Sequence, residues 1–579
     1  MKKHSLLAFI FLLFVSNISL LAQSIEDIPN NGLKHSISKE DKLKLIDFSA
    51  NIKSPTVIPT APVRNIAEFE PSEAVIIAYS GGFGLPYSVI RDLSNTGKVI
   101  IVTSTSSTTI MNLLNTNGVN TANCTVVSAT VDSWWTRDYS AWFIIDGNNN
   151  IGIVDFTYNR PSRPHDNAIP AVEANYLGLN LYLMDLVHTG GNYMCDGYNN
   201  AISTVLVSEE NSSLSLTQIQ NKTLNYLGIN NYMVRPDAQG AYIEHIDCWA
   251  KLLAPDKILV DSVPGTDARW AQYEAAASYF ANTTCAYGYN YKVTRVLIAG
   301  SAETSIAEPY SNSFIFNNRV FVPIKGGSSA PHDTAAIHAY RNAMPGYIVE
   351  GYLAAGGASW YGTDALHCRT HEIPDRQMMY IEHLPLFGNK PFSASGFSLT
   401  AKVFSYGSNP IAATYPKLVY KVDGGNWDST ITMTNIGGNM YQATIPSQTI
   451  GSHINYYLKS KDDFGKVGMH PLMGAVDAHH FIVTSPVGIN ENDPTDFYMN
   501  AFPNPVTDGN LSIYVTSEKG GPASIIIINI MGQVLFTEKI NLNAGISLNK
   551  FKLDNTPKGV YMMQLKTENK VLSKQIVVQ

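Results

Sequence analysis

Asp138, Asp247 and Cys368 each lie in a short polar stretch within otherwise apolar sequence. A guanidinium is a planar cation with five N–H donors, and two carboxylates can hold it from opposite edges. A thiolate placed beside the guanidinium carbon is then a competent nucleophile, whereas a thiol is not. Cys368 is the one cysteine flanked by potentially cationic groups, which are His367, Arg369 and His371. These residue types predict cysteine chemistry on a guanidinium held by Asp138 and Asp247.

His245 precedes Asp247 by two residues. If this stretch is extended, both side chains point to the same face, because side chains alternate along a strand. We expect His245 to act as the general acid that protonates departing ammonia and then as the base that activates water.

Each of these residues also has a purely structural interpretation. Asp138 can form a simple ion pair with Arg137, and His245 and Asp247 can be a satisfied core pair. Four other cysteines lie in or beside apolar stretches and are expected to be buried structural thiols: Cys124, Cys195, Cys248 and Cys285.

Other site chemistries fit the sequence poorly. The glycine pairs at 190–191 and 326–327 lack dinucleotide-binding spacing, and no serine-centred nucleophile elbow is present. His367, Cys368 and His371 offer no second pair at zinc-ligand spacing, so we expect neither a metal nor a cofactor. The formal charge of −7 gives no basic excess, which disfavours nucleic acid as a partner.

Residues 61–385 must position these side chains, and they alternate short apolar strands with helical patterns. Strands are expected at 74–79, 99–103, 257–260, 293–298, 319–323 and 347–352, and helices at 271–280 and 333–342. Strand–helix alternation predicts an α/β domain. The strand–helix–strand unit recurs at intervals of roughly 50–70 residues, a spacing that is compatible with a ring of modules.

The following segments alternate apolar and polar residues. Residues 386–484 predict an immunoglobulin-like β-sandwich with a hairpin turn at Asp423-Gly424-Gly425. His479-His480 near its end is expected to be a packed or solvated pair rather than a metal site. Residues 485–498 predict a linker, and 499–579 a small C-terminal β-sandwich.

The N-terminus has the pattern of a secretory signal. Residues 1–22 combine Lys2-Lys3 with an apolar run too short to span a bilayer, and an N-terminal membrane anchor is the alternative. Residues 23–60 predict a polar leader suited to trimming. No later apolar stretch has the length of a transmembrane segment, so none is expected in the mature chain.

The C-terminal segment resembles the sorting domain of type IX secretion cargo. The resemblance rests on Pro503-Asn504-Pro505, Met531-Gly532-Gln533, Lys558-Gly559-Val560-Tyr561 and the terminal Lys574-Gln575-Ile576-Val577-Val578. It implies the type IX secretion machinery as a partner, and a protein that is secreted or attached to the cell surface. An ordinary accessory sandwich is the alternative.

The 61–385 domain resembles the guanidino-group-modifying superfamily, and within it the secreted bacterial peptidylarginine deiminases, which are related to agmatine deiminases. The resemblance rests on five fragments in family order: Thr136-Arg137-Asp138, Gly190-Gly191-Asn192, Glu244-His245-Ile246-Asp247, Tyr310-Ser311-Asn312 and Leu366-His367-Cys368. It implies a five-module α/β propeller and assigns Asn312 to the catalytic site. The implied reaction converts arginine-containing peptides to citrulline and ammonia through a covalent thiouronium, without a metal.

Substrate choice depends on the far end of arginine. Arg160 and Arg163 lie in a proline-stiffened loop, and arginine suits bidentate capture of a carboxylate. A similar loop in the resembled enzymes recognises a C-terminal arginine. Trp135, Tyr242 and Ile243 are expected to line the same pocket. The alternatives are an agmatine or free-arginine deiminase, a secreted cysteine protease and a non-catalytic adhesin.

Overall fold

The computed structural model describes residue 35 and residues 52–241, 243–300, 307–354, 359–485 and 497–579, the last with short gaps at 508, 518, 530–531, 554–555 and 569. The predicted signal 1–22 and most of the predicted leader 23–60 lie outside these residues. The chain divides into two compact units, of which the first ends at Arg376 and the second begins at Gln377.

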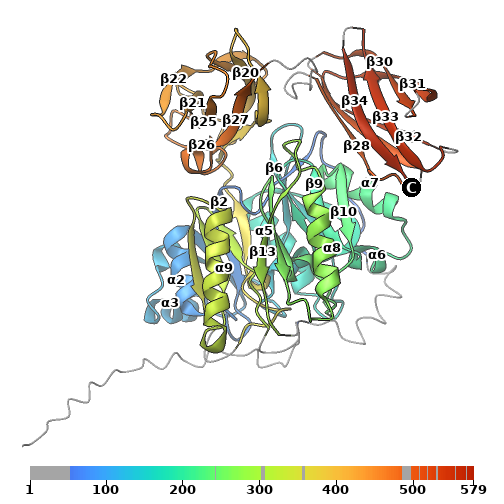
Figure 1. The fold of residues 1–579 in the computed structure, drawn as a ribbon. Coiled ribbons are helices and arrows are strands. Elements are labelled where there is room, and N and C mark those ends of the chain that lie inside the picture. Colours follow the sequence, from blue (N-terminus) through green and yellow to red (C-terminus); the bar gives the residue numbers. More distant parts are fainter. Residues whose placement is uncertain are drawn as a thin grey trace, which may run out of the picture. The chain divides into compact units, whose positions relative to one another are not determined.

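The first unit contains five small sheets within its described part, shown from blue to yellow in Figure 1. One of these sheets has the order β17-β2-β3-β4. Its elements are β2 (Ser72–Ala78), α2 (Tyr87–Thr96), β3 (Lys98–Thr103), α3 (Ser107–Thr116), β4 (Cys124–Ser128) and β17 (His371–Pro374). Strand β17 therefore joins the end of the unit to its beginning.

Two further sheets follow along the chain. The first has the order β1-β5-β6-β7 and comprises β1 (Arg64–Asn65), β5 (Trp142–Ile145), β6 (Ile151–Tyr158), α5 (Ile169–Leu177) and β7 (Asn180–His188). The second has the order β10-β9-β8 and comprises β8 (Met194–Cys195), β9 (Asn200–Thr204), α6 (Leu206–Glu209), α7 (Leu216–Leu227) and β10 (Asn231–Arg235). Helix α7 begins with a reciprocal capping box between Ser215 and Gln218.

The last two sheets repeat one pattern, an antiparallel strand pair followed by a helix and a parallel strand. One comprises β11 (Ala250–Ala254), β12 (Lys257–Ser262), α8 (Trp270–Ala281) and β13 (Lys292–Leu297). The other comprises β14 (Phe314–Phe316), β15 (Arg319–Pro323), α9 (Ala330–Ala343) and β16 (Ile348–Tyr352). Helix α9 packs against β16 and also β13 (Figure 1). The eight strands and helices predicted for this domain are confirmed to within three residues at each end.

The second unit begins with two sheets that enclose an apolar core. One contains β18 (Met379–Glu382), β20 (Phe397–Ser405), β24 (Met440–Ile445) and β23 (Thr434–Gly437). The other contains β19 (Gly388–Pro391), β27 (His479–Thr484), β25 (His453–Lys461), β26 (Val467–His470), β21 (Lys417–Val422) and β22 (Asp428–Thr432). Strand β18 pairs with β20, so residues 379–382 belong here rather than to the domain that the sequence placed at 61–385.

His479 and His480 belong to different pairs. His479 is buried, and its Nε2 lies 2.9 Å from Nδ1 of His470, whereas His480 is exposed and lies 3.2 Å from His453. Neighbouring side chains of β27 face opposite sides of the sheet, which separates the two histidines.

Residues 497–578 form two more sheets. One contains β28 (Phe497–Phe502), β29 (Asn510–Ser517) and β32 (Gly545–Lys552). The other contains β31 (Val534–Leu542), β30 (Gly521–Ile528), β33 (Gly559–Lys566) and β34 (Val571–Val578). They enclose a separate apolar core that includes Ile513, Ile525, Met563 and Ile576. Across the described part of the chain, none of the helices has the length and apolar character needed to cross a membrane.

Candidate active site

Five short segments each precede an antiparallel strand of one sheet in the first unit. They are α4 (Thr136–Tyr139) before β5, η4 (Gly190–Asn192) before β8, η5 (Ile246–Cys248) before β11, the turn at Asn312 before β14, and η8 (His367–Arg369) before β17. The same position of each repeated unit therefore supplies one predicted site residue or glycine. This repetition brings residues distant in sequence to one place.

The two acids converge on Gly191. A Cβ atom built on this glycine would lie 2.7 Å from Oδ1 of Asp138, 3.3 Å from Oδ2 of Asp247 and 2.6 Å from Nδ1 of His245. Only a residue without a side chain fits among these three groups. The predicted meeting of Asp138, Asp247 and His245 is therefore present in the structure.

Asp138 is fully buried and ionised. Burial alone would raise the pKa of its carboxyl, but nearby His35, His245 and Arg160 outweigh burial and hold that pKa well below its usual value. Arg137 does not pair with it, because Nη2 of Arg137 bonds Glu372 at 2.7 Å. The simple Arg137–Asp138 ion pair considered from the sequence is thus not formed.

His245 directly precedes a 3-10 turn, so the extended stretch from His245 to Asp247 that the sequence left open is not formed. Glu244 has a φ of 54°, and Ile246 and Asp247 form one turn of 3-10 helix. The side-chain oxygen of Asn192 accepts from the backbone N–H of Ile246 at 3.2 Å, which fixes this turn. The 3-10 turn brings both His245 and Asp247 to the site without strand alternation.

The ring of His245 can accept or donate a further hydrogen bond. Burial lowers the pKa of His245 to about 4, despite the opposing charges of Asp138 and Asp247, so the ring is neutral near pH 7. Among the residues with described positions, both ring nitrogens and Oδ1 of Asp138 are buried without a hydrogen-bond partner. Buried polar atoms are seldom left unpaired, so these three atoms are candidates to bind a polar ligand.

Asn312 contacts Cys368 directly. Its Nδ2 lies 3.3 Å from the sulfur, and its Oδ1 accepts from the backbone N–H of Cys368 at 3.3 Å. The sulfur also lies 4.0 Å from Oδ2 of Asp247. Asn312 therefore fixes the position of the sulfur beside one of the two acids.

Cys368 is a buried thiol in this state. Burial raises its pKa well above the usual value, and Asp247, Asp364 and Asp138 raise it further. The potentially cationic side chains predicted beside Cys368 do not face its sulfur. Arg369 forms two bonds to Asp364, at 2.9 and 2.8 Å. Nδ1 of His371 bonds the main-chain oxygen of Glu372. Neighbours in sequence point in different directions here because η8 is a helical turn.

His367 has a role that sequence reasoning missed. Its Nδ1 lies 2.7 Å from Oδ2 of Asp247, and its Nε2 lies 2.8 Å from Oε2 of Glu68. Lys251 binds both oxygens of Glu68, at 2.7 and 2.6 Å. Burial would raise the pKa of Glu68, but Lys251 and His367 hold it well below its usual value. A buried chain of charges thus orients Asp247.

Both loop arginines lie at the site and are buried. Nη2 of Arg160 donates to the main-chain oxygen of His35 at 3.2 Å. The guanidinium of Arg163 lies over the ring of Trp135 at 4.6 Å and bonds the hydroxyl of Tyr158 at 3.3 Å. Ile243 is buried two residues before His245, whereas Tyr242 falls outside the described residues.

His35 belongs to the predicted leader, yet it occupies the space among these residues. Its Nε2 lies 2.6 Å from Oδ2 of Asp138, and its ring stacks on Trp135 with centroids 4.7 Å apart. Its metal-binding atoms also lie within 4.8 Å of those of Asp364 and Cys368. Both of its nitrogens are engaged by oxygens at 2.6 Å, and Asp364 is bound to Arg369, so this trio does not form a prepared metal site.

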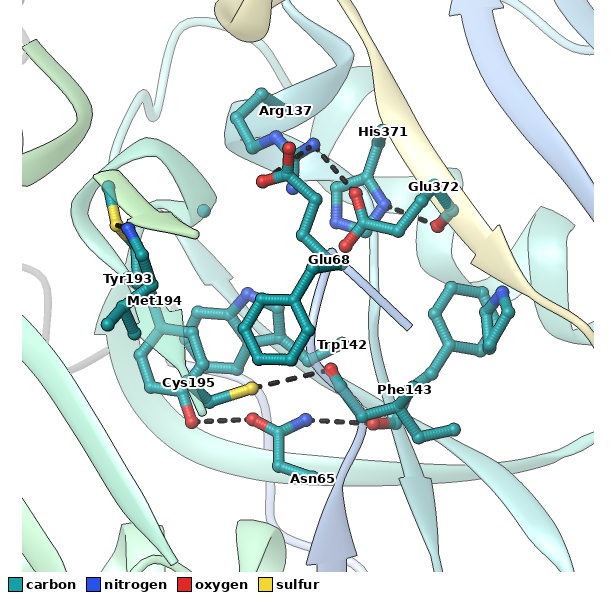
Figure 2. Close-up of a pocket in the computed structure, with 15 residues that line it drawn as sticks. Asn65, Glu68, Arg137, Trp142, Phe143, Tyr193, Met194, Cys195, His371 and Glu372 are labelled. Carbon is teal, nitrogen blue, oxygen red and sulfur yellow. Dashed lines mark hydrogen bonds and ion pairs between the residues drawn. The ribbon is translucent and has the colours of Figure 1, made fainter. Parts of the chain in front are cut away.

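A cavity of about 40 Å³ lies elsewhere in the first unit (Figure 2). Arg137, Glu68 and Glu372 face one another at one end of it, and Tyr193 bonds Asn65 at the other. Its lining residues include none of the predicted site residues. The predicted site is instead filled by His35 and Trp135.

Comparison with known proteins finds similar sequences for two parts of the chain. Residues 65–374 match the family of Porphyromonas-type peptidyl-arginine deiminases, and residues 500–579 match the secretion system C-terminal sorting domain. The chain is 24% identical over 270 residues to a putative agmatine deiminase of Legionella pneumophila, covering 44% of this chain and 75% of that protein. A putative agmatine deiminase of Yersinia pseudotuberculosis is 23% identical over 290 residues, covering 44% and 78%.

Two solved structures are also similar. The agmatine deiminase of Enterococcus faecalis has a TM-score of 0.48 and 21% identity, covering 56% of this chain and 100% of that one. The putative arginine deiminase from Porphyromonas gingivalis has a TM-score of 0.47 and 19% identity, covering 54% and 98%.

The family match covers more than half of the chain and includes the segments that converge on Gly191. The type IX sorting domain at the C-terminus indicates a protein that is secreted or attached to the outer surface of the cell. The first unit identifies the chain as a member of the Porphyromonas-type peptidyl-arginine deiminase family.

Proposed function

We propose that this protein is a secreted hydrolase that converts a peptidyl arginine, preferably at a peptide C-terminus, to citrulline and ammonia. The observation that carries the proposal is the convergence of Asp138, Asp247 and His245 on Gly191, with the sulfur of Cys368 4.0 Å from Asp247. Two buried carboxylates suit a planar cation, and a sulfur beside them suits attack on its carbon.

In the proposed reaction, Cys368 attacks the guanidinium carbon and forms a C–S bond. The thiol proton passes to neutral His245, which returns it to the departing nitrogen, and the C–N bond breaks to release ammonia. The product on the enzyme is a thiouronium. His245 then takes a proton from water, and hydroxide adds to the same carbon. Breakage of the C–S bond releases citrulline, and the hydroxyl proton of the intermediate passes to the sulfur to restore the thiol. His245 passes its proton to the released ammonia, which leaves as ammonium.

The substrate itself helps to ionise the sulfur in this mechanism. Three acids raise the pKa of Cys368 in the substrate-free arrangement, and a guanidinium between Asp138 and Asp247 adds a positive charge that opposes them. The reactive thiolate then forms only when arginine is bound. Asn312 holds the sulfur in place during this change.

Arg160 is the proposed specificity residue. Arg160 donates to the main-chain oxygen of His35, and the side chain of His35 faces Asp138. A carboxylate at the end of an arginine would lie at a comparable place and would gain a charge-assisted bond. Arg163, stacked on Trp135, supports the wall for the arginine methylenes, to which we also assign Tyr242 and Ile243.

The finer organisation of the chain is part of the same proposal. We assign the five sheets to a five-module propeller, the first pair of sheets in the second unit to an immunoglobulin-like sandwich, and residues 1–22 to a signal peptide. The domain limits of 61–385, 386–484, 485–498 and 499–579 follow the sequence, with residues 377–385 moved to the second unit because of β18.

Agmatine deimination is the second candidate, because the curated relatives include agmatine deiminases. It uses the same core site but offers Arg160 no carboxylate. A cysteine protease has no need for two acids around a cation, and an adhesin has no need for a cysteine beside them.

A citrulline assay tests the proposal. Matched peptides with C-terminal arginine, internal arginine and C-terminal arginine amide are compared with agmatine and free arginine. We expect the highest kcat/KM for the C-terminal arginine peptide and loss of turnover in Cys368→Ala. Turnover that persists in Cys368→Ala would refute the assigned nucleophile, and a preference for agmatine would favour the second candidate.

A further inference from the structure

His35 makes the contacts that the proposed substrate requires. Its Nε2 lies 2.6 Å from Oδ2 of Asp138, and its Nδ1 lies 2.6 Å from the main-chain oxygen of Thr363. Both partners accept hydrogen bonds, so the ring donates from both nitrogens and carries a positive charge. His35 thus presents a planar cation to the carboxylate proposed to bind guanidinium.

The surroundings of the ring are those of the proposed reaction. One face stacks on Trp135 at an angle of 19°, and the ring meets His245 edge-on with centroids 5.9 Å apart. A ring nitrogen lies within 4.8 Å of the sulfur of Cys368. A guanidinium cannot enter this space while the imidazole occupies it.

The main chain of His35 is held as well. Arg160 donates to its carbonyl oxygen, so one residue satisfies both the cation site and the proposed carboxylate site. His35 is only 4% exposed. From Lys53 onward the chain is anchored on the first unit, through bonds of the Lys53 ammonium to Asp155 at 2.6 Å and to the main-chain oxygen of Asn167 at 2.7 Å.

We propose that His35 is a built-in pseudosubstrate that keeps the active site closed until the N-terminal segment is removed or displaced. This inference rests on the proposed function and adds its regulation. Tethering gives the side chain a local concentration in the millimolar range, so a substrate must outcompete it or wait for its removal. The sequence joining His35 to the anchor contains Lys39, Lys42 and Lys44, which a trypsin-like protease recognises.

The first test uses the full chain with His35→Ala. This variant loses the hydrogen bond of His35 to Asp138, so the substrate no longer has to displace the imidazole. We expect kcat/KM for the arginine peptide to rise about tenfold to a hundredfold. His453→Ala, which removes an exposed histidine from β25, should leave the rate unchanged. Equal kcat/KM in wild type and His35→Ala would overturn the pseudosubstrate role and leave the proposed function intact.

Alkylation of the cysteines gives a readout that needs no catalysis. Chloroacetamidine, whose amidinium group supplies the positive charge that opposes the three acids around the sulfur, should label Cys368 faster in His35→Ala than in wild type, with the labelled peptide identified by mass spectrometry. Cys248, buried in the same unit, serves as the control for unfolding, because its labelling should stay slow in both chains. Equal labelling of Cys368 in both chains would contradict a blocked site.

A second variant, His35→Arg, places the proposed reactive group in the same position. We expect conversion of the new side chain to citrulline within the same molecule, at a rate independent of protein concentration, and no conversion when Cys368→Ala is also present. A variant that converts added peptide but not itself would overturn the inference. If neither the new side chain nor the added peptide is converted, and no variant or wild type turns over any arginine substrate, the proposed function itself fails.

Discussion

Nδ1 of His367 lies 2.7 Å from Oδ2 of Asp247, and the opposite nitrogen of the same ring bonds Glu68. The residue next to the candidate nucleophile therefore orients an acid rather than activating the sulfur. Lys251 and His367 hold the pKa of Glu68 well below its usual value despite burial, and a continuous chain of hydrogen bonds and ion pairs runs from Lys251 through Glu68 and His367 to Asp247.

Replacing His367 with Ala should disturb Asp247 and leave it without this donor. A buried hydrogen bond to a charged group contributes about 1.5–3 kcal/mol, so kcat/KM should fall roughly tenfold to a hundredfold. His367→Gln keeps a donor and should recover part of the loss. If Cys368 instead depended on the charge of His367, the pH dependence of its alkylation would shift in both variants.

Replacing Gly191 with Ala should block the site without unfolding the chain. The added Cβ would lie 2.6 Å from Nδ1 of His245 and 2.7 Å from Oδ1 of Asp138, so these two groups must move. Displacements of that size at reacting groups lower rates by about a hundredfold. Gly265→Ala, whose Cβ would have open space, should retain full activity and the same melting temperature. An active Gly191→Ala enzyme would contradict the proposed convergence.

The sequence predicted the framework better than the local geometry of the site. Alternating apolar strands and helices located α8 and β15 because these elements follow a simple periodicity. The turn at His245 did not follow it, because the φ of Glu244 and the bond from Asn192 depend on tertiary contacts. The contact of His35 with Asp138 spans 103 residues and comes from a segment without periodic pattern, so no sequence rule predicts it.

The stability of the first unit should depend on Glu173. Burial raises the pKa of this carboxyl to about 8, well above the ~4.3 of an exposed glutamate. Between these values the folded chain holds a proton that the unfolded chain has released, so this contribution to stability is present at low pH and is lost as pH rises through about 8. Glu173→Gln removes the titration and should raise the melting temperature more at pH 9 than at pH 5.

Tryptophan fluorescence measures this effect, because six of the seven tryptophans lie in the first unit. Glu209→Gln, at an exposed position of α6, is the matched control and should leave the melting curve unchanged at both pH values. An equal shift for Glu173→Gln at pH 5 and pH 9 would contradict a proton held by this carboxyl.

Substrate preference tests Arg160 most directly. In the His35→Ala background, where the side chain of His35 no longer competes, Arg160→Ala should lower kcat/KM for a C-terminal arginine peptide about a hundredfold, because a buried carboxylate would lose its charge-assisted bond. Agmatine has no carboxylate and should change by less than about threefold.

Two further variants separate charge from packing. Arg160→Lys keeps the positive charge but loses the planar guanidinium that binds a carboxylate through two hydrogen bonds. Its kcat/KM should therefore lie between that of the His35→Ala background and that of Arg160→Ala. Arg163→Ala removes the cation over Trp135 and should affect the peptide and agmatine alike, because both share the aliphatic chain that this wall contacts. An equal loss of kcat/KM for the peptide and for agmatine in Arg160→Ala would show that Arg160 supports the fold of the pocket and does not bind a carboxylate. The enzyme would then recognise its substrates by the guanidinium end alone.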